Sequence, residues 1–184
     1  MTTTLIVALV VGGLLVGGLV LAYNGLVALR NAVENAWASI DVQLKRRYDL
    51  IPNLVETVKG YASHERETLD AVTRARAAAM AADNAADQAR AENELSQALF
   101  NLRAVAEAYP DLKANRNFQQ LQDELTNTED RIAFARQGYN DAVRRYDTRR
   151  QSIPFNVVAA LGSFGSYDYF EADPDSRSPV EVRF

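Results

Sequence analysis

Residues Leu5–Ala22 read LIVALVVGGLLVGGLVLA, an apolar stretch that decides the architecture of the chain. These 18 residues carry no charge. As a helix rising about 1.5 Å per residue they would extend roughly 27 Å, close to the ~30 Å hydrocarbon core of a bilayer. A soluble amphipathic helix would need a polar face, which this stretch lacks. We therefore predict a transmembrane helix over residues 5–23, with Tyr23 as its interfacial aromatic residue.

A cleaved signal peptide is the alternative interpretation of the same stretch. Such a peptide needs a basic segment before its apolar part, whereas Met1–Thr4 contains no Lys or Arg. We therefore expect an uncleaved anchor. Arg30 is the nearest basic residue after it, and Lys45–Arg47 come next. Because Lys and Arg are enriched on the cytoplasmic side, residues 1–4 are predicted to lie outside the cytoplasm and the helical domain inside it.

Four glycines interrupt the aliphatic residues of the anchor. Gly13 and Gly17 form a GxxxG motif, and Gly12 and Gly18 flank it. Small residues at this spacing let two transmembrane helices approach closely. Gly is also common in transmembrane helices that do not associate, so the motif alone leaves both interpretations open. Our prediction is self-association through Gly13 and Gly17.

Beyond the anchor the apolar residues follow a heptad repeat, the pattern of a packed helix. Only Arg47 breaks it. Pro52 lies within the repeat, and because a proline removes one backbone hydrogen bond we expect a kink there and not an end. Gly60 and Ser63 mark a turn, with Ser63 as the expected N-cap of the next helix. The two heptad series are Leu26, Val33, Ile40, Arg47, Leu54 and Tyr61, and Trp37, Leu44, Ile51 and Val58.

Two further helices complete the predicted fold. The second extends from about His64 to Ala108, and its middle, residues 75–91, is rich in Ala, which favours helix but buries little area. This middle part is either a thin exposed helix or contains a break at Asp83–Asn84. Similar lengths and tight turns predict an all-α fold, in which the N-terminal transmembrane helix continues without a break into an antiparallel bundle of three long helices over residues 24–151. The heptad series of the third helix is Phe118, Leu125, Ile132, Tyr139 and Tyr146.

The basic triplet Lys45–Arg47 lies 23 residues past Ala22. An upright helix would hold it roughly 35 Å from the hydrocarbon edge, which is several Debye lengths in physiological salt. The triplet is therefore predicted to be a solvated or intra-bundle charged cluster and not a membrane-surface patch.

The composition changes after Gln151. In residues 152–184 the helical periodicity fades, whereas aromatic residues persist, and disordered tails are usually poor in aromatics. The spacing of Phe155, Val158 and Leu161 fits a short helix across the bundle, and Pro179–Phe184 alternate as an added strand or docking peptide would. The aromatic side chains of this tail either cap their own bundle or dock onto a neighbouring copy. They include Phe164, Tyr167, Tyr169, Phe170 and Phe184.

The composition excludes several kinds of chemistry. The 184-residue chain has no Cys, so thiolate metal sites and cysteine nucleophiles are ruled out. Its single histidine, His64, lies in HERET, which lacks the second His of a zincin motif. The net charge of -4 argues against a nucleic-acid partner. We expect no cofactor, no metal and no catalytic residue, and hence a protein that is not an enzyme.

Several stretches carry a family resemblance that spans nearly the whole chain from Tyr23. They are YNGLVALRNAVENAWASIDVQLKRRYDLIPNLVETVKGYASHE at Tyr23–Glu65, YPDLKANRNFQQLQDEL at Tyr109–Leu125, TEDRIAFARQGYNDAV at Thr128–Val143, and IPFNVVAALGSF in the tail. These stretches resemble the LemA family. One departure is Asp147, where the family pattern has Asn.

The resemblance implies a single-pass protein of the bacterial inner membrane with a short extracytoplasmic N-terminus and a cytoplasmic helical domain. It supplies no activity and no catalytic residues. Members of this family often accompany a heat-shock-type membrane zinc metallopeptidase, an association that points to envelope stress or membrane protein quality control.

Two functions follow as hypotheses. The first is a non-enzymatic scaffold, bound to the lipid bilayer, that forms a homo-oligomer and organises or shapes the membrane. The second is an adaptor that presents substrates to a membrane metallopeptidase. The candidate interface residues are Arg46, Arg47, Tyr48, Pro52, Asn53, Phe155, Phe164, Phe170 and Phe184.

Overall fold

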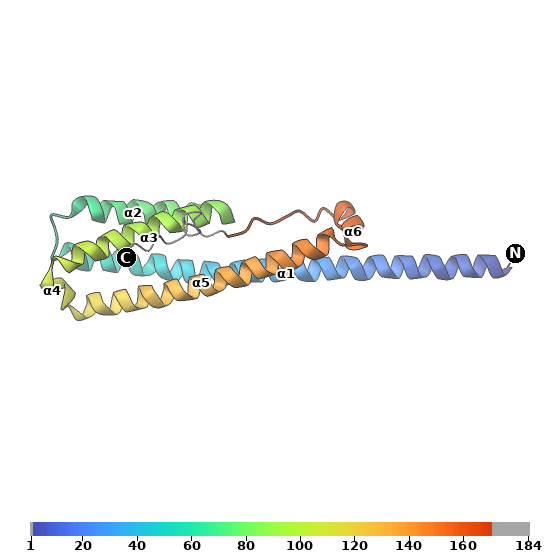
Figure 1. Ribbon diagram of the computed structural model, residues 1–184, viewed down its shortest axis with the longest axis horizontal. Coiled ribbons are helices and arrows are strands. Elements are labelled where there is room, and N and C mark those ends of the chain that lie inside the picture. Colours follow the sequence, from blue (N-terminus) through green and yellow to red (C-terminus); the bar gives the residue numbers. More distant parts are fainter. Residues whose placement is uncertain (1, 171–184) are drawn as a thin grey trace, which may run out of the picture. The chain divides into compact units, whose positions relative to one another are not determined.

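A computed structural model describes residues 2–170, and in that range the chain is helical without strands (Figure 1). The all-α fold predicted from the sequence is therefore confirmed. The helices are α1 (Thr2–Lys59), α2 (Arg66–Met80), α3 (Ala85–Glu107), α4 (Pro110–Lys113), α5 (Arg116–Gln151) and α6 (Phe155–Leu161).

Helix α1 is continuous over 58 residues, so the apolar stretch and the first heptad helix are a single helix, as predicted. Its most apolar 18-residue window has a mean hydropathy of 2.8 and is only 6% buried. The window is long and apolar enough to cross a membrane. The described part of the chain leaves this surface uncovered, so the first part of α1 is a candidate spanning segment by length and composition.

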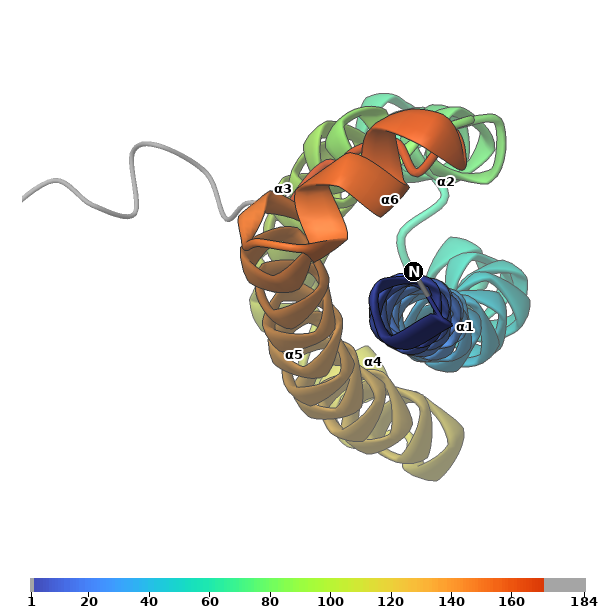
Figure 2. The ribbon, with the colours of Figure 1, turned by 90° about the vertical axis from the view of Figure 1, so that its right-hand side faces the viewer.

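The chain divides into two compact units, which we describe separately. Unit 1 comprises Met1–Ala38 and Gly138–Tyr167, and unit 2 comprises Ser39–Gln137 and Asp168–Phe184. In unit 1 the start of α1 packs with the end of α5 and with α6. After α5 the chain turns, and α6 runs across the α5 axis (Figure 2). The main buried side chains of unit 1 are Leu26, Val33, Tyr139, Val143, Tyr146, Val158 and Phe164.

Unit 2 contains the end of α1, the whole of α2, α3 and α4, and the start of α5. Helices α2 and α3 lie side by side and run in opposite directions (Figure 1). Its core is built from the predicted heptad positions of α1 and α5 together with apolar residues of the α2–α3 pair. The largest contributors are Ile40, Ile51, Leu54, Val58, Val72, Leu95, Leu102, Leu112, Phe118, Leu125 and Ile132.

The middle helix differs from the prediction of one helix from His64 to Ala108. The chain breaks at Asp83–Asn84, the alternative considered for this stretch, and folds back so that α2 and α3 form a hairpin. Asn84 caps α3, because its side-chain oxygen accepts a hydrogen bond of 2.9 Å from the backbone N–H of Asp87. Within the Ala-rich segment Ala79, Ala85 and Ala89 are buried, whereas the other alanines are exposed or half-buried. The prediction that Ser63 caps α2 is wrong: Glu65 is the N-cap residue, without a side-chain cap bond.

The short helix predicted in the tail is confirmed as α6. The turn that follows α6 requires a glycine. A Cβ on Gly162 would lie 2.6 Å from Cε2 of Phe164, so a larger residue at this position would displace the Phe164 ring. This turn brings Phe164 back against the bundle. The predicted docking segment Pro179–Phe184 lies outside the described residues.

Candidate functional site: a buried ion pair beside a groove

Arg47, the one residue that breaks the heptad pattern of α1, is buried with 3% of its surface exposed. Its partner is Glu92 of α3, also buried, and Nη1 of Arg47 lies 2.7 Å from Oε2 of Glu92. Nη2 of Arg47 donates a second hydrogen bond, of 2.8 Å, to Oγ of Ser96. Burying a lone cation would be very costly, so this pairing explains why the core accepts an arginine.

The other carboxylate oxygen of Glu92 is also satisfied. It accepts a hydrogen bond from the Tyr48 hydroxyl and one of 3.3 Å from Nε2 of Gln88. The Gln88 amide also donates to the Tyr48 hydroxyl oxygen at 2.9 Å and to the Ala79 carbonyl at 3.1 Å. These groups therefore form a hydrogen-bond network in which the buried polar atoms are one another's donors and acceptors. We call Arg47, Tyr48, Gln88, Glu92 and Ser96 the Arg47 cluster.

Tyr48 acts in this cluster as a donor. Burial, and then the hydrogen bond and negative charge of Glu92, raise the pKa of Tyr48 far above its ordinary value of 10.0. The phenol therefore stays protonated even at alkaline pH where an exposed tyrosine ionises, and it presents its O–H to the carboxylate. This arrangement stabilises a charge pair and supplies no activated nucleophile.

A second contact explains how α1 continues through Pro52. A proline has no backbone N–H, so the Tyr48 carbonyl, four residues earlier, loses its partner within the helix. Arg76 of α2 takes that place, because its Nε donates a 2.8 Å hydrogen bond to the Tyr48 carbonyl oxygen. Pro52 is inside α1 and not at its end, as the heptad pattern predicted.

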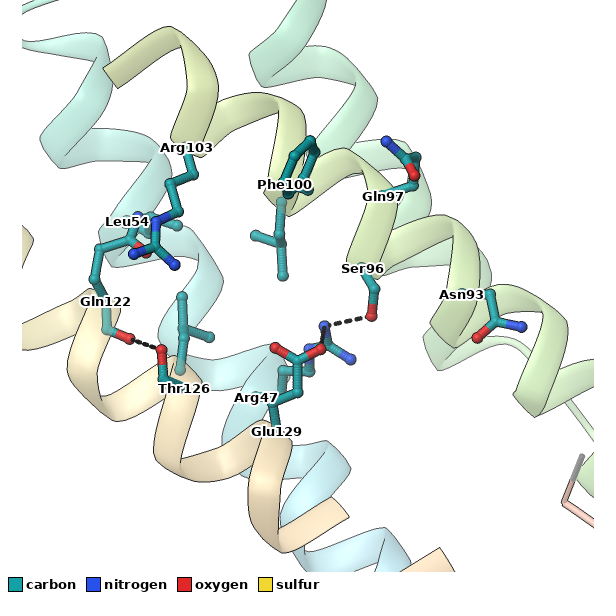
Figure 3. Close-up of a pocket in the computed structure, with 12 residues that line it drawn as sticks. Arg47, Leu54, Asn93, Ser96, Gln97, Phe100, Arg103, Gln122, Thr126 and Glu129 are labelled. Carbon is teal, nitrogen blue, oxygen red and sulfur yellow. Dashed lines mark hydrogen bonds and ion pairs between the residues drawn. The ribbon is translucent and has the colours of Figure 1, made fainter. Parts of the chain in front are cut away.

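An open groove of about 400 Å³ lies beside the Arg47 cluster, between α1, α3 and α5 of unit 2 (Figure 3). The guanidinium of Arg47 borders it, with the carboxylate of Glu129 at 4.0 Å. Its walls mix apolar and polar side chains. They are Arg47, Leu54, Asn93, Ser96, Gln97, Leu99, Phe100, Arg103, Gln122, Leu125, Thr126 and Glu129.

The groove offers hydrogen bonds and ionic contacts. Over residues 2–170 the structure holds no group of three or more His, Cys, Asp or Glu side chains arranged to bind a metal ion. Arg103 and Phe100 give the groove a cation and an exposed aromatic ring, a combination typical of surfaces that contact proteins.

The predicted interface residues of α1 fall into two groups. Arg47 and Tyr48 are buried in the Arg47 cluster, whereas Arg46, Pro52 and Asn53 are exposed. Arg46 forms an exposed ion pair with Glu124 of α5. Arg46 and Arg47 therefore form ion pairs within unit 2, whereas Lys45 is exposed.

The aromatic residues of the tail lie against their own chain. In unit 1 the guanidinium of Arg149 lies 4.6 Å from the Phe155 ring centre, and Phe164 packs edge-on against Tyr23 at 5.5 Å. In unit 2, Phe170 is 1% exposed and lies 4.9 Å beneath the guanidinium carbon of Arg136. These contacts correspond to the interpretation in which the tail caps its own bundle. Phe184 lies outside the described residues.

Gly13 and Gly17 face open space. A Cβ built on either of them, or on Gly12 or Gly18, would meet no atom within 4 Å. Nothing in the described part of the chain therefore covers the GxxxG surface, and its part in self-association stays a prediction.

Sequence reasoning missed the partners of Arg47. Glu92, Gln88 and Ser96 lie in or beside the Ala-rich segment, where no apolar period marks the buried face. The one available signal was Arg47 itself, because a cation at a heptad position needs a buried anion.

Comparison with known proteins places this architecture in a family. The chain is 23% identical over 188 residues to the magnetosome protein MamQ 2 of Paramagnetospirillum magneticum, an alignment that covers 88% of this chain and 69% of that protein. It is 22% identical to magnetosome protein MamQ of Magnetospirillum gryphiswaldense, with the same coverage. It is 25% identical over 160 residues to protein LemA of Metamycoplasma hominis, covering 86% of this chain and 73% of that protein. The model of the LemA family matches residues 36–184, and the chain belongs to this family.

Proposed function

We propose that this chain is a non-enzymatic, membrane-anchored scaffold that self-associates in the bacterial inner membrane and organises or shapes it. One observation carries the proposal. Helix α1 extends without a break from an exposed apolar segment into the core of a helical bundle. A membrane anchor and a rigid packing surface are therefore parts of the same helix.

The energetics of the apolar segment favour insertion. Leu5–Ala22 contains twelve Leu, Ile and Val residues. Each such residue contributes about -0.3 to -0.6 kcal/mol to the free energy of membrane insertion at the centre of a helix, so together they contribute roughly -4 to -7 kcal/mol. The basic residues that follow the segment favour a cytoplasmic bundle. Alkaline extraction of membranes tests the anchor, and protease protection of spheroplasts tests the orientation. Recovery of the intact chain in the soluble fraction would contradict the anchor.

Self-association is supported by the open GxxxG surface. Because Gly13 and Gly17 lie on one face, replacing both by Leu would hold a second helix away. Ala8 and Gly12 have the same spacing on another face, so Ala8→Leu with Gly12→Leu is a matched control. Blue-native electrophoresis of detergent-extracted protein should show an oligomer for the wild type and the control pair and a smaller species for Gly13→Leu with Gly17→Leu. A monomeric wild type would refute the scaffold.

The groove beside the Arg47 cluster favours the second candidate, an adaptor for a membrane metallopeptidase. Photo-crosslinking residues at Gln97 and Gln122, which line the groove, would capture such a partner in cells. A crosslinker at the exposed Val42, outside the groove, is the control. Crosslinks to the peptidase only from the groove positions support the adaptor, and crosslinks only to further copies of the chain support the scaffold.

A further inference from the structure

Helix α6 lies against the part of α1 that directly follows the apolar segment. The Phe155 ring is 3.3 Å from the Cβ position of Gly25, and the Phe164 ring packs edge-on against Tyr23. Tyr23 and Gly25 are one and three residues past Ala22, which is about 1.5 and 4.5 Å along the helix axis. If Leu5–Ala22 spans the bilayer, α6 is held at the edge of the hydrocarbon core.

One side of the segment containing α6 is apolar and exposed. Val157 and Leu161 lie one turn apart on α6 and are 53% and 81% exposed, and Ile153, in the turn just before the helix, is 83% exposed. On the other side, Val158 and Ala159 are buried against unit 1. In water these three large side chains would be an unfavourable surface, whereas the boundary between head groups and acyl chains would bury them.

The charge around α6 also suits a membrane surface. Within residues 1–38 and 138–167 there are five arginines and three carboxylates, so this part of the chain is net positive although the whole chain is net -4. Three carboxylates are partly engaged: Glu34 with Arg30, Asp141 with Arg144 and Asp147 with Arg150. The exposed arginine nearest α6 is Arg149, whose guanidinium lies over the Phe155 ring. It is placed to meet a lipid phosphate.

We propose that α6 is a second membrane contact, in which Ile153, Val157 and Leu161 enter the interface of an anionic phospholipid bilayer and Arg149 binds its head groups. This inference rests on the proposed membrane anchor and adds to it. A single spanning helix can rotate about its axis, whereas an interfacial helix packed against its end fixes how unit 1 faces the bilayer.

The absence of Cys from the chain allows a direct test on the full-length protein in vesicles. A polarity-sensitive fluorophore is attached through Leu161→Cys or, as a second site, Val157→Cys. Two reference sites are Leu15→Cys in the apolar segment and Phe100→Cys, an exposed apolar position of α3. Vesicles contain phosphatidylcholine alone or mixed with phosphatidylglycerol, with or without lipids that carry a quencher.

We expect the α6 labels to shift to shorter wavelength and to be quenched several-fold more by quencher lipids than the Phe100→Cys label. The shift should be larger with phosphatidylglycerol, and Arg149→Gln should remove that difference. If the Leu15→Cys label is quenched but the α6 labels are not, the anchor stands and the α6 proposal is overturned. A third outcome is that the α6 labels shift to shorter wavelength but are quenched only by quenchers attached to other copies of the chain, and not by quencher lipids. That result would mean that a second copy covers α6, and it would also overturn the α6 proposal. An unquenched Leu15→Cys label refutes the anchor itself.

Discussion

Breaking the ion pair between Arg47 and Glu92 tests the described core most directly. The substitution Arg47→Met keeps an unbranched apolar side chain in place and removes the cation. Glu92 then stays buried without its ion-pair partner, since its side chain is 5% exposed, and Arg136 is a cation that still acts on it. Removing one partner of such a buried pair typically costs about 3–5 kcal/mol.

Other contacts of Arg47 change this estimate little. Glu129, 4.0 Å away, is 61% exposed, and a pair with so exposed a partner contributes about 0–1 kcal/mol. For a chain of this size each kcal/mol lowers the melting temperature by roughly 2–4 °C, so Arg47→Met should lower it by roughly 6–20 °C. Arg46→Met is the matched control. Its pair with Glu124 is about half exposed, and its loss should cost no more than about 1 kcal/mol.

The double variant Arg47→Met with Glu92→Leu shows whether the instability of Arg47→Met comes from the unpaired charge of Glu92 or from the loss of the Arg47 side chain itself. It removes both charges, and apolar replacement of a buried pair is often neutral or stabilising. We expect it to recover most of the stability lost in Arg47→Met. Thermal unfolding of the full chain in detergent, followed by far-ultraviolet circular dichroism, measures all four proteins. The buried pair is refuted if Arg47→Met has the same melting temperature as Arg46→Met. It is also refuted if the double variant is no more stable than Arg47→Met.

Three further predictions follow from single contacts. Arg76→Met should lower the free energy of unfolding by about 1–3 kcal/mol, because the Tyr48 carbonyl loses its hydrogen-bond donor. Pro52→Ala restores a backbone N–H, and in a double-mutant cycle followed by denaturant unfolding it should recover part of this loss. Gly162→Ala should cost about 1–3 kcal/mol through its clash with the Phe164 ring, and Phe164→Leu in the same chain should relieve it, as judged by melting temperature. Because the pKa of Tyr48 is raised, the folded chain keeps a proton that the unfolded chain releases above pH ~10. The contribution of this group to the free energy of unfolding should be full below that pH and should fall above it by up to about 1.4 kcal/mol per pH unit. In denaturant titrations at several pH values, Tyr48→Phe should make this slope less steep.

The long helices could be predicted from the sequence because their apolar residues recur at a fixed interval. In α1 the first heptad series is buried from Leu26 to Leu54, and in α5 the series from Phe118 to Tyr146 is buried throughout. Tyr61 is the exception, because it lies in the turn after α1 and is 44% exposed. Periodicity of large side chains is a local property, and it is therefore visible without the fold.

The α2–α3 hairpin and the Arg47 cluster could not be predicted in the same way. Ala fits both a buried and an exposed position, so residues 75–91 carry no period that separates one long helix from two short ones. The break at Asp83–Asn84 was one of the two alternatives that the sequence left open, and the cap that Asn84 makes there is seen only in the structure. The pair of Arg47 and Glu92, in contrast, joins positions 45 residues apart, and its geometry exists only once the hairpin has folded.

The α2–α3 hairpin and the Arg47 cluster are linked through the register of α3. Among the residues that α3 buries are Ala85, Ala89, Ala98 and Ala106, whose small side chains would pack almost equally well if the helix slid by one turn. Leu95 and Leu102 of α3 are fully buried and oppose such a slide by apolar packing, to which these alanines add little. A slide of one turn would carry Glu92 roughly 5.4 Å from Arg47 and leave two buried charges unpaired. We infer that the charge which interrupts the heptad pattern adds to the buried leucines of α3 in selecting the register of the Ala-rich hairpin, a role that buried polar residues also have in coiled coils.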